Sequence, residues 1–147
     1  EQDWIINGMY FITRYKYIET EYLEQPSKGG ESRAFCKAMM RQSDNLYRKE
    51  DLDDMSRNSS INPGFGPNGS NTYNIMAYKG GPNCNHLFRR QVWVGVDFGV
   101  PLDPTSQLAN QISVYRARKY GYRVKGNPSE TAVAPINQPN QGYLKPR

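Results

Sequence analysis

The chain has 147 residues, 37% of them hydrophobic, and a formal net charge of +5 at pH 7. This length suits one domain, and the low apolar fraction predicts that part of its burial comes from neighbouring molecules. No segment approaches the roughly 18 consecutive apolar residues of a membrane-spanning helix, and the acidic start (EQDW) lacks a signal-like apolar core. We therefore expect no membrane partner. Because residue 1 is not methionine, we expect a processed fragment or the ordered part of a longer protein.

The charge is unevenly distributed along the chain. Residues 1–114 contain 12 basic and 13 acidic residues, whereas residues 115–147 contain 7 basic and 1 acidic. Such a basic tail favours a polyanion, nucleic acid above all, or an acidic protein surface. The alternative is a solvated arm whose charge only aids solubility. The candidate partner- or nucleic-acid-binding residues are Arg116, Arg118, Lys119, Arg123, Lys125, Lys145 and Arg147.

The first predicted elements are a strand and a helix. Aromatic and β-branched residues alternate at a period of two over residues 9–23, which is typical of a strand. After a glycine-rich turn, helix-favouring residues follow over residues 32–42, with Ser32 as the expected cap and Cys36 beside the apolar side. We expect the strand to bury one face: Phe11, Thr13, Tyr15 and Tyr17.

Four further segments are predicted before residue 100. Residues 49–57 favour a short helix, because acidic residues in its first turns complement the helix dipole and Leu52 and Met55 are spaced i, i+3. Residues 58–71 are dense in Gly, Pro, Asn and Ser and predict a long loop. Strands are expected at residues 72–78 and 89–98, so the segment between them would form the end of a hairpin.

The C-terminal third is predicted to be a helix followed by an arm. Asp103 or Thr105 would cap a helix that runs to about Tyr120. Beyond Gly121 the chain has four prolines and no apolar period, which is typical of an extended arm. The expected fold is α+β, a small antiparallel sheet with two or three short helices and a long extended C-terminal arm. The expected divisions are an N-terminal extension (1–8), a compact domain (9–120) and a basic Pro/Gly-rich arm (121–147).

One loop contains two of the three residues best suited to bind a metal. The single histidine, His86, lies two residues after Cys84, and Cys36 is the other cysteine. Thiolate and imidazole are ligands that zinc prefers, so these three residues are candidate ligands of Zn²⁺ at the hairpin end. A fourth ligand is not identified, and Asp44 or Glu50 is only a guess. The alternatives are a Cys36–Cys84 disulfide and two buried free cysteines.

The sequence offers little for catalysis. A Cys36–His86 dyad lacks an identifiable orienting residue and an oxyanion feature. The His-x-Glu and Pro-Cys-x-x-Cys pattern of zinc deaminases is missing, and no Gly-Lys-Ser/Thr follows the glycine-rich segment near residue 66. We therefore expect a protein that is not an enzyme.

Four segments resemble a known phage domain. They are residues 32–36, 47–52, 62–66 and 78–90. Together they are similar to the minor head protein domain of tailed bacteriophages typified by phage Mu protein F, as it occurs in virion structural and cargo proteins of crAss-like phages. The family has an Arg-x-Phe-Cys block and a later Pro-Asn-Cys block that leads into a strand. The matching residues are Arg33, Phe35 and Cys36, then Pro82, Asn83, Cys84 and His86, and the likeness covers roughly residues 9–98.

The resemblance implies a noncatalytic virion protein, a minor head or cargo component inside the head or near the portal vertex. Its partners would be major capsid or portal-region proteins, with packaged DNA nearby, and it would be present in multiple copies. The alternative is a small zinc-stabilised module that binds single-stranded nucleic acid, in which Tyr15, Tyr17 and the basic tail stack on and neutralise the strand.

Overall fold

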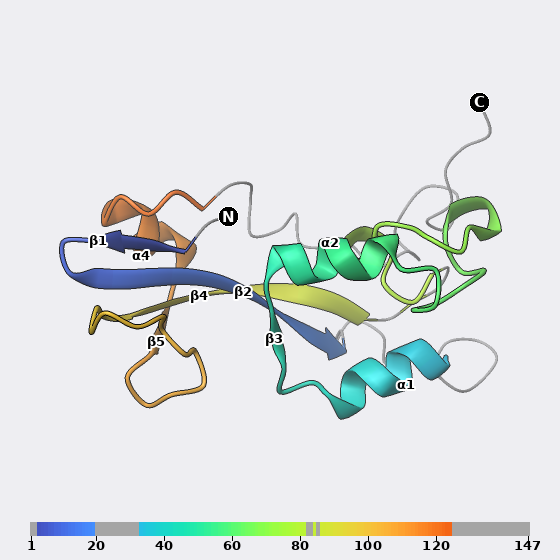
Figure 1. Ribbon diagram of the computed structural model, residues 1–147, viewed down its shortest axis with the longest axis horizontal. Helices are drawn as coiled ribbons and strands as arrows, with labels where there is room; N and C mark the ends of the chain where they lie inside the picture. The colour runs from blue at the N-terminus through green and yellow to red at the C-terminus, as the bar shows by residue number, and fades with distance from the viewer. Residues whose placement is uncertain (1–2, 20–32, 82–83, 85, 125–147) are drawn as a thin grey trace.

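The computed structural model describes residues 3–19, 33–81, 84 and 86–124. This part of the chain forms a five-stranded antiparallel sheet with four α-helices and one short 3-10 helix, Pro67–Gly69 (Figure 1). The predicted α+β class with a small antiparallel sheet is therefore confirmed. The expected extended arm lies outside the described residues from position 125 onward.

Two long strands form the centre of the sheet. Strand β2 (Met9–Glu19) pairs with β4 (His86–Val96) along its whole length, with Met9 opposite Val96 and Glu19 opposite His86. The strand predicted at residues 9–23 is confirmed over 9–19, and residues 20–23 lie outside the described part. The strand predicted at 89–98 is also present, although it begins three residues earlier and ends at Val96.

Three short strands complete the sheet. Strand β1 (Trp4–Ile6) and strand β3 (Leu46–Tyr47) pair with the same edge of β2, β1 along residues 9–11 and β3 along residues 15–16. Strand β5 (Asn110–Ile112) pairs with β4. A two-residue turn of Asn7 and Gly8, both with positive φ, joins β1 to β2. Residues 4–6 therefore belong to the sheet and not to a separate N-terminal extension.

The buried face of β2 contributes residues to two hydrophobic clusters. Phe11, Thr13, Tyr15 and Tyr17 are each at most 4% exposed, as the period-two pattern predicts. The first cluster, called here the Tyr17 cluster, contains Tyr15, Tyr17, Phe35, Cys36, Met39, Leu52, Tyr73, Ile75, Cys84 and Phe88. The second, the Phe11 cluster, contains Phe11, Val92, Ala117, Tyr122 and Val124.

Two helices near the Tyr17 cluster follow the prediction closely. Helix α1 (Ala34–Arg41) buries Phe35, Cys36 and Met39, and its N-cap position is Arg33, which makes no side-chain capping bond. Ser32, the expected cap, lies outside the described residues. Helix α2 (Lys49–Arg57) has the predicted bounds and buries Leu52.

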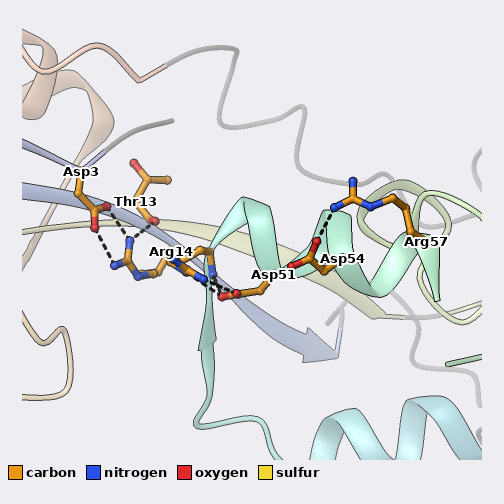
Figure 2. Close-up of polar contacts among 7 residues, drawn as sticks. Asp3, Thr13, Arg14, Asp51, Asp54 and Arg57 are labelled. Atoms are coloured by element: carbon orange, nitrogen blue, oxygen red, sulfur yellow. Dashed lines mark hydrogen bonds and ion pairs between the residues drawn. The ribbon is translucent and has the colours of Figure 1, made fainter.

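Ion pairs accompany α2 and the edge of β2. The backbone N–H and guanidinium of Arg48 both donate to the carboxylate of Asp51, which holds the first turn of α2. Further along the helix Asp54 pairs with Arg57, and on β2 the guanidinium of Arg14 donates to both carboxylate oxygens of Asp3, at 2.8 and 3.0 Å (Figure 2). Asp51, Asp53 and Asp54 therefore each pair with a cation three or four residues away, on α2 or at its N-cap.

The strand predicted at residues 72–78 is wrong. This segment contains a single helical turn, α3 (Ile75–Tyr78), and the side chain of Asn74 accepts a hydrogen bond from the N–H of Ala77 at 3.2 Å. An asparagine N-cap satisfies an amide that would otherwise lack a partner, whereas an apolar pattern only four residues long suits either type of structure. Consequently Cys84 does not lie in a hairpin but in the loop between α3 and β4.

The long helix predicted between residues 103 and 120 is also wrong. Residues 101–109 form turns, in which Asp103 accepts a hydrogen bond from the N–H of Thr105 at 2.8 Å. Strand β5 follows, and only Val114–Lys119 is helical (α4), capped by the hydroxyl of Ser113. The apolar spacing of this segment is compatible with a helix, but residues 110–112 instead pair with β4, with Ile112 opposite Val92. No helix in the described ranges is long and apolar enough to cross a membrane.

Residues 121–124 pack on the sheet and are not part of an arm. Gly121 has φ +91°, a left-handed conformation that ends α4 and turns the chain back. The ring of Tyr122 stacks on Phe11 at 5.4 Å between centroids, and its hydroxyl lies 2.8 Å from the hydroxyl of Thr13. Tyr122 and Val124 are 2% and 5% exposed. The predicted boundary at residue 121 is therefore wrong, and the compact part reaches at least Val124.

Candidate metal centre

Three elements bring the predicted ligands together. Cys36 comes from α1, Cys84 from the loop after α3, and His86 is the first residue of β4. Their ligand atoms all lie within 4.8 Å of one another, and none of the three residues is more than 3% exposed. Within the described ranges, no carboxylate joins this group, so neither Asp44 nor Glu50 belongs to it.

The distances within the group suit a bound cation. The Sγ atoms of Cys36 and Cys84 are 3.7 Å apart, and the Sγ of Cys84 is 3.7 Å from the Nδ1 of His86. Both cysteines are free, so the disulfide alternative is not formed in this structure. Cys36, Cys84 and His86 can therefore bind a metal ion together.

Two glycines allow the loop to approach α1. A Cβ atom on Gly80 would lie 2.4 Å from the Sγ of Cys36, so a larger residue would force the loop or Cys36 to move. Gly81 has φ +98°, and a Cβ there would lie 2.5 Å from the carbonyl oxygen of Phe65. The glycine pair is therefore needed for close packing of the cysteine loop.

A hydrogen-bond network fixes the carbonyls of this turn. The hydroxyl of Tyr73 donates to the carbonyl of Lys79 at 2.6 Å, and the amide of Asn62 donates to that hydroxyl at 2.8 Å and to the carbonyl of Gly80 at 3.3 Å. The guanidinium of Arg33 donates to the same Gly80 carbonyl at 3.1 Å. Sequence reasoning missed this role for all three donors. The only available signal was that Arg33 and Asn62 lie in segments that resemble the phage domain.

Tyr17 lies directly against the candidate ligands. Its hydroxyl donates to the Sγ of Cys36 at 3.4 Å and is 3.6 Å from the Sγ of Cys84. Its ring stacks on that of His86, with centroids 5.1 Å apart and planes inclined by 8°. The sequence predicted that Tyr17 would be buried, but nothing in it indicated contact with the cysteines.

The two thiols differ in acidity. The pKa of Cys84 is lowered, first by the hydrogen bond from Cys36 and further by those involving His86 and Tyr17. The pKa of Cys36 is raised, chiefly because it donates to Cys84 and also because it is buried. Cys84 therefore tends toward the thiolate, which is the form that binds a metal.

A buried cation lies close to this thiolate. Lys79 is 0% exposed, and burial lowers its pKa to about 8, whereas the charge of Cys84 acts in the opposite direction. Its φ of +51° is unusual for a residue with a side chain. The loop therefore combines a buried positive charge with the sulfur atoms of the centre.

The predicted basic residues lie far from the metal centre. Arg116, Arg118 and Lys119 are exposed on α4, and Arg123 is exposed just after it. Helix α4 covers the Phe11 end of the sheet, and β2 rises roughly 20 Å between Phe11 and Tyr17, so the two sites are at opposite ends (Figure 1). The other three predicted residues, Lys125, Lys145 and Arg147, lie outside the described part.

The two tyrosines expected to stack on nucleic-acid bases are not available for that role. Tyr15 and Tyr17 are 1% and 0% exposed, because both point into the Tyr17 cluster. The interpretation that they contact a single strand is therefore wrong. The period-two pattern that predicted their burial was the stronger signal.

Comparison of the chain with protein-family models, with curated proteins and with solved structures gives no match. The resemblance to the phage head domain is thus a hypothesis founded on the motif residues alone.

Proposed function

We propose that this chain is a noncatalytic structural protein of a bacteriophage virion, a minor head or cargo component stabilised by one Zn²⁺ ion. One observation supports the proposal above others. The four segments that resemble the phage domain, which are separated in sequence, pack around a single centre. Arg33 and Asn62 from two of them donate to the same carbonyl of the third, and Leu52 from the fourth lies in the Tyr17 cluster.

Zinc is the metal that this donor set favours. Two sulfur atoms and an imidazole are typical of structural zinc sites, which hold the ion in a tetrahedral arrangement. The ion would link α1, the cysteine loop and β4, because each contributes one of the three residues. Binding to such a site contributes directly to folding stability, since the unfolded chain has no preformed site.

Burial of the centre supports a structural role over a catalytic one. Cys36, Cys84 and His86 are 2–3% exposed, so a substrate has no direct access to them in this conformation. A nucleophilic cysteine needs to be partly exposed and paired with a base that is held by a third group. The ring of His86 instead stacks on Tyr17.

Exposed apolar side chains support a protein partner. Eight of the nine large apolar side chains exposed in the described residues lie on β1, at and after the end of β4, before β5, and on and just after α4, away from the metal centre: Trp4, Ile5, Val96, Phe98, Val100, Leu108, Tyr115 and Tyr120. The ninth, Phe65, lies beside Gly81 of the cysteine loop. Exposed apolar surface of this kind marks interaction sites. We assign this end of the sheet to docking on a major capsid or portal-region protein, on the interior of the head, in multiple copies.

Metal analysis tests the first half of the proposal. The protein purified under reducing conditions should contain one zinc per chain, and a strong chelator should lower its melting temperature. Cys36→Ser and His86→Ala should lose the metal, whereas the control Met39→Leu, a volume-conserving change on the same helix, should retain it. Folded protein that binds no zinc or other thiophilic metal would refute the centre.

Particle analysis tests the second half. In particles purified from an infected culture and treated with protease and DNase, the chain should be detected by mass spectrometry, because a component inside the head is protected. Phe98→Glu should reduce its incorporation while the metal content stays unchanged, since Phe98 is 65% exposed and far from the centre. Detection in infected cells but not in particles would refute the virion role.

A second candidate, a single-stranded nucleic-acid-binding module, is favoured by one observation on α4. Tyr115 and Tyr120 are 67% and 57% exposed and flank the exposed cations Arg116, Arg118 and Lys119. Exposed aromatic rings and cations together suit stacking and charge neutralisation of a single strand. Binding to an oligonucleotide that weakens steeply with salt and is lost in Tyr120→Ala would support it. Binding weaker than millimolar would leave the structural role.

A further inference from the structure

We infer that the hydroxyl oxygen of Tyr17 is the fourth ligand of the metal centre, which makes it a closed Cys₂HisTyr site. The inference rests on the proposed zinc ion and adds to it a ligand that sequence pattern did not indicate. It predicts how the fourth coordination position is filled and why the site has no open position for chemistry.

The geometry expected of such a site follows from bond lengths. Zinc lies about 2.3 Å from sulfur, about 2.0 Å from a histidine nitrogen and about 2.0–2.2 Å from an oxygen ligand. For tetrahedral angles, these lengths place two sulfur ligands about 3.8 Å apart, sulfur and nitrogen about 3.6 Å apart, and sulfur and oxygen about 3.5 Å apart. Four ligand atoms around zinc should therefore form a tetrahedron with edges of that size.

Four of the six edges of this tetrahedron can be compared with observed distances. The two sulfur atoms are 3.7 Å apart, and the Sγ of Cys84 is 3.7 Å from the Nδ1 of His86. The hydroxyl oxygen of Tyr17 is 3.4 Å from one sulfur and 3.6 Å from the other. These four edges each lie within about 0.2 Å of the values expected from zinc bond lengths.

Packing holds the Tyr17 hydroxyl in this position. Tyr17 lies near the C-terminal end of β2, where it pairs with Phe88 on β4, and its side chain is 0% exposed. Phe35 packs edge-on against its ring and His86 stacks on it. The hydroxyl therefore points at the two sulfur atoms from a fixed strand, and a water molecule would have to displace it to occupy the same corner.

Burial first, and then the charges of Cys84 and Cys36, raise the pKa of the Tyr17 phenol, so its loss of a proton depends on the positive charge of the bound ion. Coordination by two thiolates and a phenolate gives the zinc site a net charge of −1, and the three protons lost from their neutral forms go to solvent. Lys79 is fully buried and interacts with the charge of Cys84, and Arg33 acts on Cys36. A buried lysine beside a negatively charged centre is a paired charge, which is the condition under which buried charge is tolerated.

Cobalt substitution tests the assignment in the full chain. Co²⁺ added to metal-free protein reports coordination number through its visible ligand-field bands, and a phenolate bound to the ion gives a near-ultraviolet difference band. In wild type we expect both signals, together with no spectral change on addition of azide. Tyr17→Phe should lose the phenolate band, release one proton fewer on binding, weaken Co²⁺ binding at least tenfold and acquire an azide-sensitive spectrum.

The matched control is Tyr15→Phe. Tyr15 is buried on the same face of β2 two residues away, in the same cluster, so its variant should keep the wild-type spectrum. The wild-type phenolate band requires no variant, so the test stands even if Tyr17→Phe folds poorly. Co²⁺ binding without a phenolate band, and with an unchanged spectrum in Tyr17→Phe, would overturn the tyrosine ligand but leave the metal centre. Failure of wild type to bind Co²⁺ or Zn²⁺ would refute the centre itself.

Discussion

Residues 121–124 should decide whether the Phe11 cluster holds together. Ending the chain after Tyr120 removes Tyr122 and Val124, which are 2% and 5% exposed. Loss of a buried aromatic ring costs about 3–5 kcal/mol, and loss of a buried valine adds about 1.5 kcal/mol. Because the two residues share one cluster and their effects are not additive, we expect the free energy of unfolding to fall by roughly 5 kcal/mol in total.

This loss is comparable to the whole stability of a small domain, which is about 5–15 kcal/mol. The comparison should be made by urea unfolding of two zinc-loaded proteins, one ending at Val124 and one ending at Tyr120. The two proteins differ only in residues 121–124. Both keep Cys36, Cys84 and His86, so the candidate metal centre is the same in each. With an m-value of about 2 kcal/mol/M, the midpoint should fall by roughly 2–3 M.

A point variant separates packing from hydrogen bonding. Tyr122→Phe keeps the ring that stacks on Phe11 but leaves the hydroxyl of Thr13 without its partner at 2.8 Å. It should cost only about 1 kcal/mol. Equal urea midpoints for the two shortened proteins would refute the reasoning, because they would mean that Tyr122 and Val124 do not stabilise the sheet.

Three further outcomes are expected. Gly80→Ala should weaken zinc binding at least tenfold in a competition assay with a chelator, because its Cβ would lie 2.4 Å from the Sγ of Cys36; unchanged affinity would show that the loop moves freely. Tyr73→Phe removes the bond to the Lys79 carbonyl and should lower zinc affinity about tenfold, whereas an effect on melting temperature alone would contradict a role in positioning the loop. Between about pH 8 and 10.5, Lys79 is deprotonated in the folded chain but still protonated in the unfolded chain, so the free energy of unfolding should rise with pH over this range. In Lys79→Met the urea midpoint should no longer rise with pH over this range. An equal rise in the variant and in wild type would show that another group causes it.

The elements that sequence predicts well are those with a long or repeated signal. Strand β2 shows period-two alternation over more than ten residues, and α2 has acidic residues at its start and Leu52 on its buried side. By contrast α3 has only four residues and depends on the cap that Asn74 provides. The error after residue 100 has the same origin, because β5 exists through pairing with β4 and not through local preference.

Only some residues of the candidate site could likewise be predicted from the sequence. Cys36, Cys84 and His86 are rare residues in this chain, so their chemistry could be recognised before their positions were known. Tyr17 is one of 11 tyrosines, and nothing local distinguishes it from Tyr15. Its contact with both sulfur atoms arises from the register of β2 against β4, which is a property of the assembled sheet.

The shared ribbon of β2 and β4 has a consequence for cooperativity. Its two strands are paired over 11 residues each, yet the Tyr17 and Phe11 clusters pack on different lengths of them. Removal of the proposed ion should act on one length only, so we expect the Tyr17 half to open more readily than the Phe11 half. The half that depends on the metal would contain α1, the loop with Cys84 and the start of β4.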